Sequence, residues 1–122
     1  MTRTQRQYVV DIIEAMANAE SFIDEITIED LRGDLKTQLA LQRCFSIIGE
    51  AANKIDTGLR DRYPTIPWRK MIGMRNVMVH GYWTVSLEVV WDTVRKRFPG
   101  DKPALQQILN ELPPETDLLS GN

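Results

Sequence analysis

The stretch that decides the fold is residues 29–55, EDLRGDLKTQLALQRCFSIIGEAANKI. Its apolar side chains recur every three or four residues, which is the spacing of an α-helix face. One row of this kind is formed by Leu31, Leu35 and Leu39. A second row, on a different side, comprises Leu41, Phe45, Ile48, Ala52 and Ile55. A long helix with two apolar sides is expected to lie at the centre of a helical domain, or to contact a partner subunit as well.

Helical spacing continues on both sides of this stretch. Helices are expected over residues 4–24, 29–55, 59–63, 68–79, 87–97 and 101–111. Thr57-Gly58 is expected to end the long helix, and Pro67 to open the helix at Trp68, because proline is tolerated in a first turn. Pro99-Gly100 is expected to break the chain between the last two helices. Since no segment shows a strand pattern, the predicted fold class is all-α.

Length and composition predict one domain. The chain has 122 residues, of which 43% are hydrophobic. We expect residues 1–114 to form the domain and residues 115–122 to form a mobile tail. The single cysteine, Cys44, excludes an internal disulfide, and the spacing of a structural zinc site is absent. The chain also lacks a signal peptide and a long apolar run, so a cytoplasmic location without membrane insertion is expected.

Charge is distributed unevenly along the chain. The net charge is −2, which argues against a general nucleic-acid coat protein. Residues 11–34 carry eight acidic side chains against one basic, whereas residues 60–75 carry five basic against one acidic. A local field of this kind attracts a polyanion, although two solvated helix faces would show the same pattern. Arg69 and Lys70, inside the basic segment, are therefore candidate RNA-binding residues.

The motif that carries chemistry is Arg75-Asn-Val-Met-Val-His80-Gly-Tyr82, which contains the only histidine. Histidine exchanges protons near neutral pH, and arginine binds phosphate. RNA supplies its own 2′-OH nucleophile. Its cleavage needs a base, an acid for the leaving oxygen, and positive charge on the crowded phosphorus. Arg75 and His80 are therefore candidate catalytic residues for phosphate chemistry without a metal.

The spacing of these two residues raises a geometrical question. Five positions along an ideal helix leave the two side chains about 140° apart. They converge if the helix ends at His80, as Gly81 would allow, or if a second subunit completes the site. RNA cleavage of this type often uses two histidines. We therefore infer, as a hypothesis, that a two-fold dimer brings two copies of His80 to one cleft.

Two neighbours have open roles. Tyr82 is a candidate for stacking on a base, for modification by a nucleotide, or for ordinary packing. Asn76 is a candidate for binding phosphate or for orienting the imidazole, and otherwise an ordinary polar helix residue.

The chain resembles the HepT-like toxins of the HEPN superfamily (higher eukaryotes and prokaryotes nucleotide-binding domains). The signature of that family is Arg, four to six residues, His, any residue, Tyr, and it is complete here as Arg75, His80 and Tyr82. The resemblance covers residues 8–112. Supporting segments are Asp11-Ile12, Ile48-Gly49-Glu50-Ala51-Ala52, Ile66-Pro67-Trp68-Arg69, Met74-Arg75-Asn76 and Val90-Trp91.

This resemblance implies an antiparallel bundle of four to five helices that forms a homodimer. It implies a metal-independent RNase toxin of a type VII-like toxin–antitoxin system, with Arg75 and His80 as catalytic residues. Tyr82 would be the residue adenylylated by an MNT-type nucleotidyltransferase antitoxin. That partner would use ATP and magnesium, while this chain would need no cofactor. Glu50 is a further candidate cleft residue, or else a buried partner for an arginine.

Two other functions stay open at this point. The first is a non-catalytic module that binds a nucleotide for, or serves as a scaffold for, a nucleotidyltransferase. The second is a helical dimer in which the motif only stabilises the interface.

Overall fold

A computed structural model describes residues 3–79 and 87–113, with only the backbone described for residues 76–79. These ranges contain seven α-helices and one π-helical turn, and they contain no strand, which confirms the all-α prediction. The elements are α1 (Gln5–Phe22), α2 (Ile28–Arg32), α3 (Leu35–Asn53), α4 (Thr57–Arg62), α5 (Trp68–Val79), α6 (Leu87–Asp92), η1 (Thr93–Arg97) and α7 (Phe98–Glu111).

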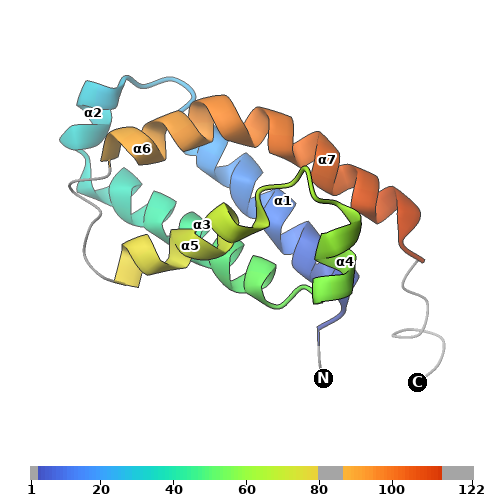
Figure 1. Cartoon of the computed structure of the whole chain (residues 1–122). Coiled ribbons are helices and arrows are strands. Elements are labelled where there is room, and N and C mark those ends of the chain that lie inside the picture. Colours follow the sequence, from blue (N-terminus) through green and yellow to red (C-terminus); the bar gives the residue numbers. More distant parts are fainter. Residues whose placement is uncertain (1–2, 80–86, 114–122) are drawn as a thin grey trace.

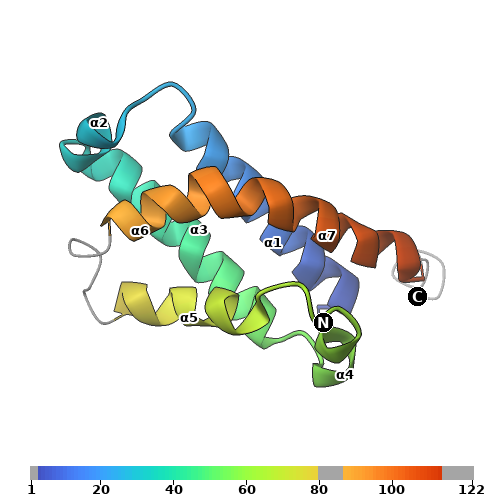
Figure 2. The same cartoon turned by 45° about the horizontal axis from the view of Figure 1, so that its top comes forward.

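The long helices form a bundle in which α1, α3, α5 and the stretch from α6 to α7 run in alternating directions (Figures 1 and 2). Helix α3 packs against α1 on one side and α5 on the other, and α7 packs against α1. Figure 1 shows α6, η1 and α7 as one continuous helical stretch that runs antiparallel to α1. The short helices α2 and α4 lie at opposite ends of the bundle. None of the described helices is long and apolar enough to cross a membrane.

The core is built from the apolar rows that the sequence predicts. The fully buried side chains of α1, α3 and α7 include Val9, Ile12, Met16, Leu41, Ile48, Phe98, Leu105 and Ile108. The rings of Phe45 and Phe98 meet at 5.8 Å between centroids, which joins α3 to the last helical stretch. Burial of the Cys44 thiol raises its pKa.

Local capping explains where the first helix begins. The Thr4 hydroxyl accepts a hydrogen bond from the Gln7 backbone N–H, and the Gln7 side chain accepts one from the Thr4 N–H. This capping box satisfies two backbone donors that an uncapped helix leaves free. The predicted helix over residues 4–24 is confirmed as α1.

The single helix predicted over residues 29–55 is wrong. Gly33 and Asp34 separate α2 from α3. The Asp34 carboxylate accepts hydrogen bonds from the Thr37 backbone N–H at 3.1 Å and from the Thr37 hydroxyl at 2.6 Å. These bonds cap α3 and lower the pKa of Asp34. Asp34 therefore starts a new helix where periodicity alone indicated continuation.

This break changes what the first leucine row does. Leu31 is fully buried on α2, whereas Leu35 and Leu39 on α3 are 66% and 53% exposed. The apolar side formed by Leu35 and Leu39 therefore lies outside the bundle, where it is available to another molecule.

Two predicted boundaries also differ. Thr57 and Gly58 open α4 instead of ending the preceding helix, which already ends at Asn53.

Pro99 does not break the chain, because α7 continues from η1. In a regular α-helix, the proline ring clashes with the carbonyl four residues back. Here that carbonyl belongs to Arg95 in the π turn, where the Phe98 N–H donates to the Thr93 carbonyl five residues back. The π turn therefore accommodates the proline.

Candidate active site

The candidate site is organised by the contact between α3 and α5. A Cβ atom placed on Gly49 of α3 would lie 2.8 Å from both the Cβ and the backbone nitrogen of Arg75 on α5. Real Cβ atoms do not approach other atoms so closely, so the two helices can touch only because residue 49 is glycine. This contact fixes the backbone from which the Arg75 side chain projects.

The Arg75 side chain is exposed, although its backbone packs on Gly49. Within the described residues it has no hydrogen bond and no ion pair. A guanidinium with no partner among the described residues has donors to offer a ligand, and its planar fork matches phosphate oxygens. An exposed arginine in this position fits the predicted role of Arg75 in binding a phosphate, and that role stays a prediction.

A stripe of side chains on α3 leads toward this arginine. Leu35, Leu39, Gln42, Ser46 and Gly49 follow one another at steps of four, three, four and three residues, which keeps them on one side of the helix. The stripe begins with the two exposed leucines and ends at the glycine on which Arg75 packs. A partner that covered the leucines and extended along the stripe would reach the Gly49 contact, about 15 Å beyond Leu39.

The other residues of the motif are only partly described. Asn76 lies on α5, directly after Arg75, with only its backbone described. His80 and Tyr82 lie outside the described residues. Convergence of Arg75 and His80 on one phosphate stays a prediction.

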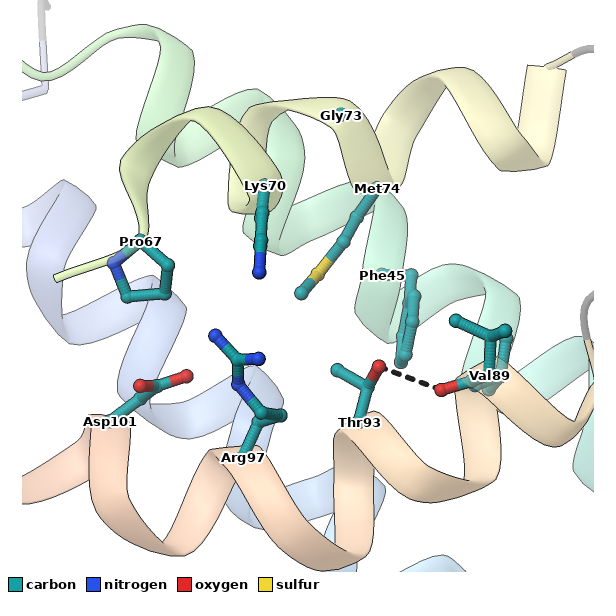
Figure 3. Close-up of a pocket in the computed structure, with 10 residues that line it drawn as sticks. Phe45, Pro67, Lys70, Gly73, Met74, Val89, Thr93, Arg97 and Asp101 are labelled. Atoms are coloured by element: carbon teal, nitrogen blue, oxygen red, sulfur yellow. Dashed lines mark hydrogen bonds between the residues drawn. The ribbon is translucent and has the colours of Figure 1, made fainter.

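The two basic candidates on α5 point to different sides. Arg69 lines an open groove between α4 and α5, together with Arg60 and Trp68. Lys70 lines a separate cavity between α5 and η1 (Figure 3). Successive helix residues are about 100° apart, so the two side chains are not members of one surface. Arg60, which sequence reasoning counted only as part of a basic segment, is the one that joins Arg69 in a groove.

Glu50 is exposed on α3, directly after Gly49. It lines a polar groove between α1 and α3, together with Arg43 and Lys54. Because Glu50 is exposed, the idea that it is a buried partner for an arginine is wrong. Its place as a candidate cleft residue beside the Gly49 contact stays a prediction.

Gly49 is the residue whose role sequence reasoning missed. A signal was present, since glycine inside a helix is less favourable than alanine and often has a packing reason. That Arg75 is the residue in contact with Gly49 depends on how α3 and α5 pack together. The periodicity of either helix alone does not predict this packing.

Comparison with known proteins decides the family. A family model described as ribonuclease HepT-like matches residues 12–112. The chain belongs to this family. It is 39% identical over 108 residues to a Thermococcus cleftensis protein named "Probable ribonuclease HepT", covering 88% of this chain and 98% of that protein. It is 30% identical over 112 residues to a Methanocaldococcus jannaschii protein named as a "Putative RNase", covering 92% and 93%. No solved structure matches the chain. The predicted resemblance to HepT-like proteins is confirmed.

Proposed function

We propose that this HepT-like chain is a metal-independent endoribonuclease, the toxin of a two-gene toxin–antitoxin system that acts in the cytoplasm. The observation that carries the proposal is the exposed Arg75, which packs on Gly49 and has no hydrogen-bond or ion-pair partner within residues 3–75 and 87–113. The family name supports RNA as the substrate, and the same motif supplies a proton carrier in His80.

The proposed reaction needs only groups that the RNA and this chain supply. One His80 imidazole takes the proton from the ribose 2′-OH, whose oxygen attacks the adjacent phosphorus. Arg75 stabilises the extra negative charge on the five-coordinate phosphorus through charge-assisted hydrogen bonds. The bond to the 5′-oxygen then breaks, and this oxygen takes a proton from an imidazolium. The products are a 2′,3′-cyclic phosphate and a free 5′-hydroxyl. In a dimer, the imidazolium that protonates the 5′-oxygen would belong to the partner subunit.

A homodimer would be built on the α3 stripe of Leu35, Leu39, Gln42 and Ser46. In a two-fold dimer the same patch of each subunit meets its copy. The exposed leucines supply the apolar centre that such an interface needs. Because the stripe ends at the Arg75 contact, its pairing would bring two copies of the motif toward one cleft.

The double variant Leu35→Ser, Leu39→Ser is expected to shift the protein from dimer to monomer at micromolar concentration and to lower RNA cleavage at least tenfold. Because 66% of Leu35 and 53% of Leu39 is exposed, loss of both side chains weakens the interface by about 2–4 kcal/mol on each side. Sedimentation velocity measures the mass, and a gel assay measures cleavage. Phe22→Ser, which alters another exposed apolar residue on α1, is the matched control and should stay dimeric. A double variant that keeps the wild-type mass would contradict this interface.

Regulation by adenylylation is the second part of the proposal. An MNT-type nucleotidyltransferase antitoxin would use ATP and magnesium to attach AMP to Tyr82. The tyrosine oxygen would bond to the α-phosphorus of ATP and lose its proton, and pyrophosphate would leave. The attached phosphodiester adds negative charge two residues from His80. Arg75 would then bind this phosphate instead of the substrate phosphate, and the modified toxin would occupy its own cleft.

Tyr82→Phe is expected to remain toxic when the antitoxin is co-expressed, because phenylalanine has no hydroxyl to modify. Colony counts with and without induction measure the toxicity. Tyr8→Phe is the control, since Tyr8 lies in the groove between α1 and α3, and the antitoxin should still neutralise that variant. Full neutralisation of Tyr82→Phe would show that modification of this tyrosine is not how the antitoxin works.

A further inference from the structure

A cavity of about 320 Å³ lies between α5 and the π turn η1, apart from Arg75 and Gly49 (Figure 3). One end is apolar and is lined by Phe45, Met74 and Val89. The other end is charged and is lined by Lys70, Arg97 and Asp101. Ligand pockets typically combine an apolar wall with a few polar groups in this way.

The helices around the cavity explain why it stays open. Helix α5 packs on α3, and the cavity separates its other side from η1. A Cβ added to Gly73 on the α5 wall would meet no atom within 4 Å, so the space in front of this residue is unfilled. On the opposite wall, π turns are rare and occur often at functional sites.

The charges at the polar end do not cancel. Figure 3 shows the side chains of Lys70 and Arg97 pointing toward each other from opposite walls, with Asp101 next to Arg97. Lys70 has no ion-pair partner in the described part of the chain. One carboxylate faces two cations, so this end of the cavity keeps one positive charge for an anionic group.

The apolar end restricts what the ligand is. Thr93 supplies a hydroxyl there, but that hydroxyl already donates to the Val89 carbonyl at 2.7 Å. A nucleobase placed against Phe45 and Met74 would bury polar edges without partners, which costs free energy. A hydrocarbon ring buried at the same place carries no such cost.

We propose that this cavity is a binding site for a small organic anion with an apolar one- or two-ring body. The rings lie against Phe45, Met74 and Val89, and the carboxylate, sulfonate or phosphate group lies between Lys70 and Arg97. This site goes beyond the RNA-cleaving function. Met74 directly precedes Arg75, so the bound anion contacts the helix that carries the candidate active site.

The test compares naphthoate with its uncharged analogue naphthamide by isothermal titration calorimetry. We expect wild type to bind naphthoate at least tenfold more tightly than naphthamide. Lys70→Gln removes a charge-assisted bond and should weaken naphthoate binding about tenfold. Gly73→Leu fills the cavity without meeting a neighbour at its Cβ and should abolish binding.

The control variants carry the same types of substitution at positions outside the cavity. Lys54→Gln alters an exposed lysine in the groove between α1 and α3, and Gly58→Leu adds the same side chain to α4 at a position with no atom within 4 Å. Both should bind naphthoate as wild type does.

Lys70→Gln changes only an exposed side chain, so it tests the proposal even if Gly73→Leu does not fold. No binding of naphthoate at millimolar concentration, equal binding of naphthamide, unchanged binding by Lys70→Gln, or tighter binding of adenosine monophosphate at this site would overturn the proposal. RNA cleavage is not part of the readout, so the outcome is independent of the proposed nuclease.

Discussion

Arg75→Ala is expected to lower the single-turnover rate of RNA cleavage by about 10²- to 10³-fold, which is the typical loss when one group that stabilises transition-state charge is removed. The Arg75 side chain is exposed and has no partner among the described residues, so its removal should leave the unfolding temperature unchanged. Cleavage of a defined RNA at saturating enzyme measures the rate, and thermal unfolding measures the stability.

Two variants sharpen this result. Arg75→Lys keeps the charge but loses the planar fork that contacts two phosphate oxygens, so only a small part of the rate should return. Arg69→Ala removes an exposed arginine of the same helix, from the groove that it shares with Arg60, and should raise KM without lowering the rate at saturation. If Arg75→Ala cleaves at the wild-type rate, Arg75 does not stabilise the transition state.

Gly49→Ala should destabilise the protein by about 1–3 kcal/mol, the usual cost of forcing an extra carbon into a packed contact. The new Cβ would stand 2.8 Å from the Cβ and the backbone nitrogen of Arg75, and backbone cannot yield as a flexible side-chain end does. Helix α5 must therefore shift on α3, which moves Arg75 and lowers RNA cleavage as well. Urea unfolding measures the free energy, and the cleavage assay measures the displacement of the arginine.

Other glycines in helices provide the control for Gly49. Cβ atoms at Gly58 and Gly73 would have no neighbour within 4 Å. Alanine at either position should leave the protein as stable as wild type or more stable by about 0.5–1 kcal/mol, because alanine favours the helix over glycine. If all three alanine variants behave alike, the contact at Gly49 does not hold α5 in place.

The sequence was sufficient for the helices whose signals are local. Helix α1 has a capping box at Thr4, and α5 begins directly after Pro67 as predicted. The break before α3 was missed because Asp34 interrupts a row of leucines whose spacing is helical on both sides. The continuation of the helix through Pro99 was missed because it depends on a π turn, which the local sequence pattern does not predict.

In the candidate site, too, local features were predictable and contacts between helices were not. Residue types and motif spacing were enough to single out Arg75, and the angular spacing of helix residues would have separated Arg69 from Lys70. The contact of Arg75 with Gly49 was not predictable, because it depends on the distance between two helix axes. The positive charge shared by Lys70 and Arg97 was equally hidden, since these residues come from helices that are distant in sequence.

The most direct measurement is RNA cleavage by purified wild-type and His80→Ala protein in the presence of excess EDTA, with the new RNA ends identified by mass spectrometry. We predict that wild type cleaves in EDTA and leaves a 2′,3′-cyclic phosphate. His80→Ala should be slower by about 10²-fold or more, because it lacks the proton carrier. Equal cleavage by both proteins, or cleavage by wild type only when magnesium is added, would contradict a site in which His80 and Arg75 act together on one phosphate.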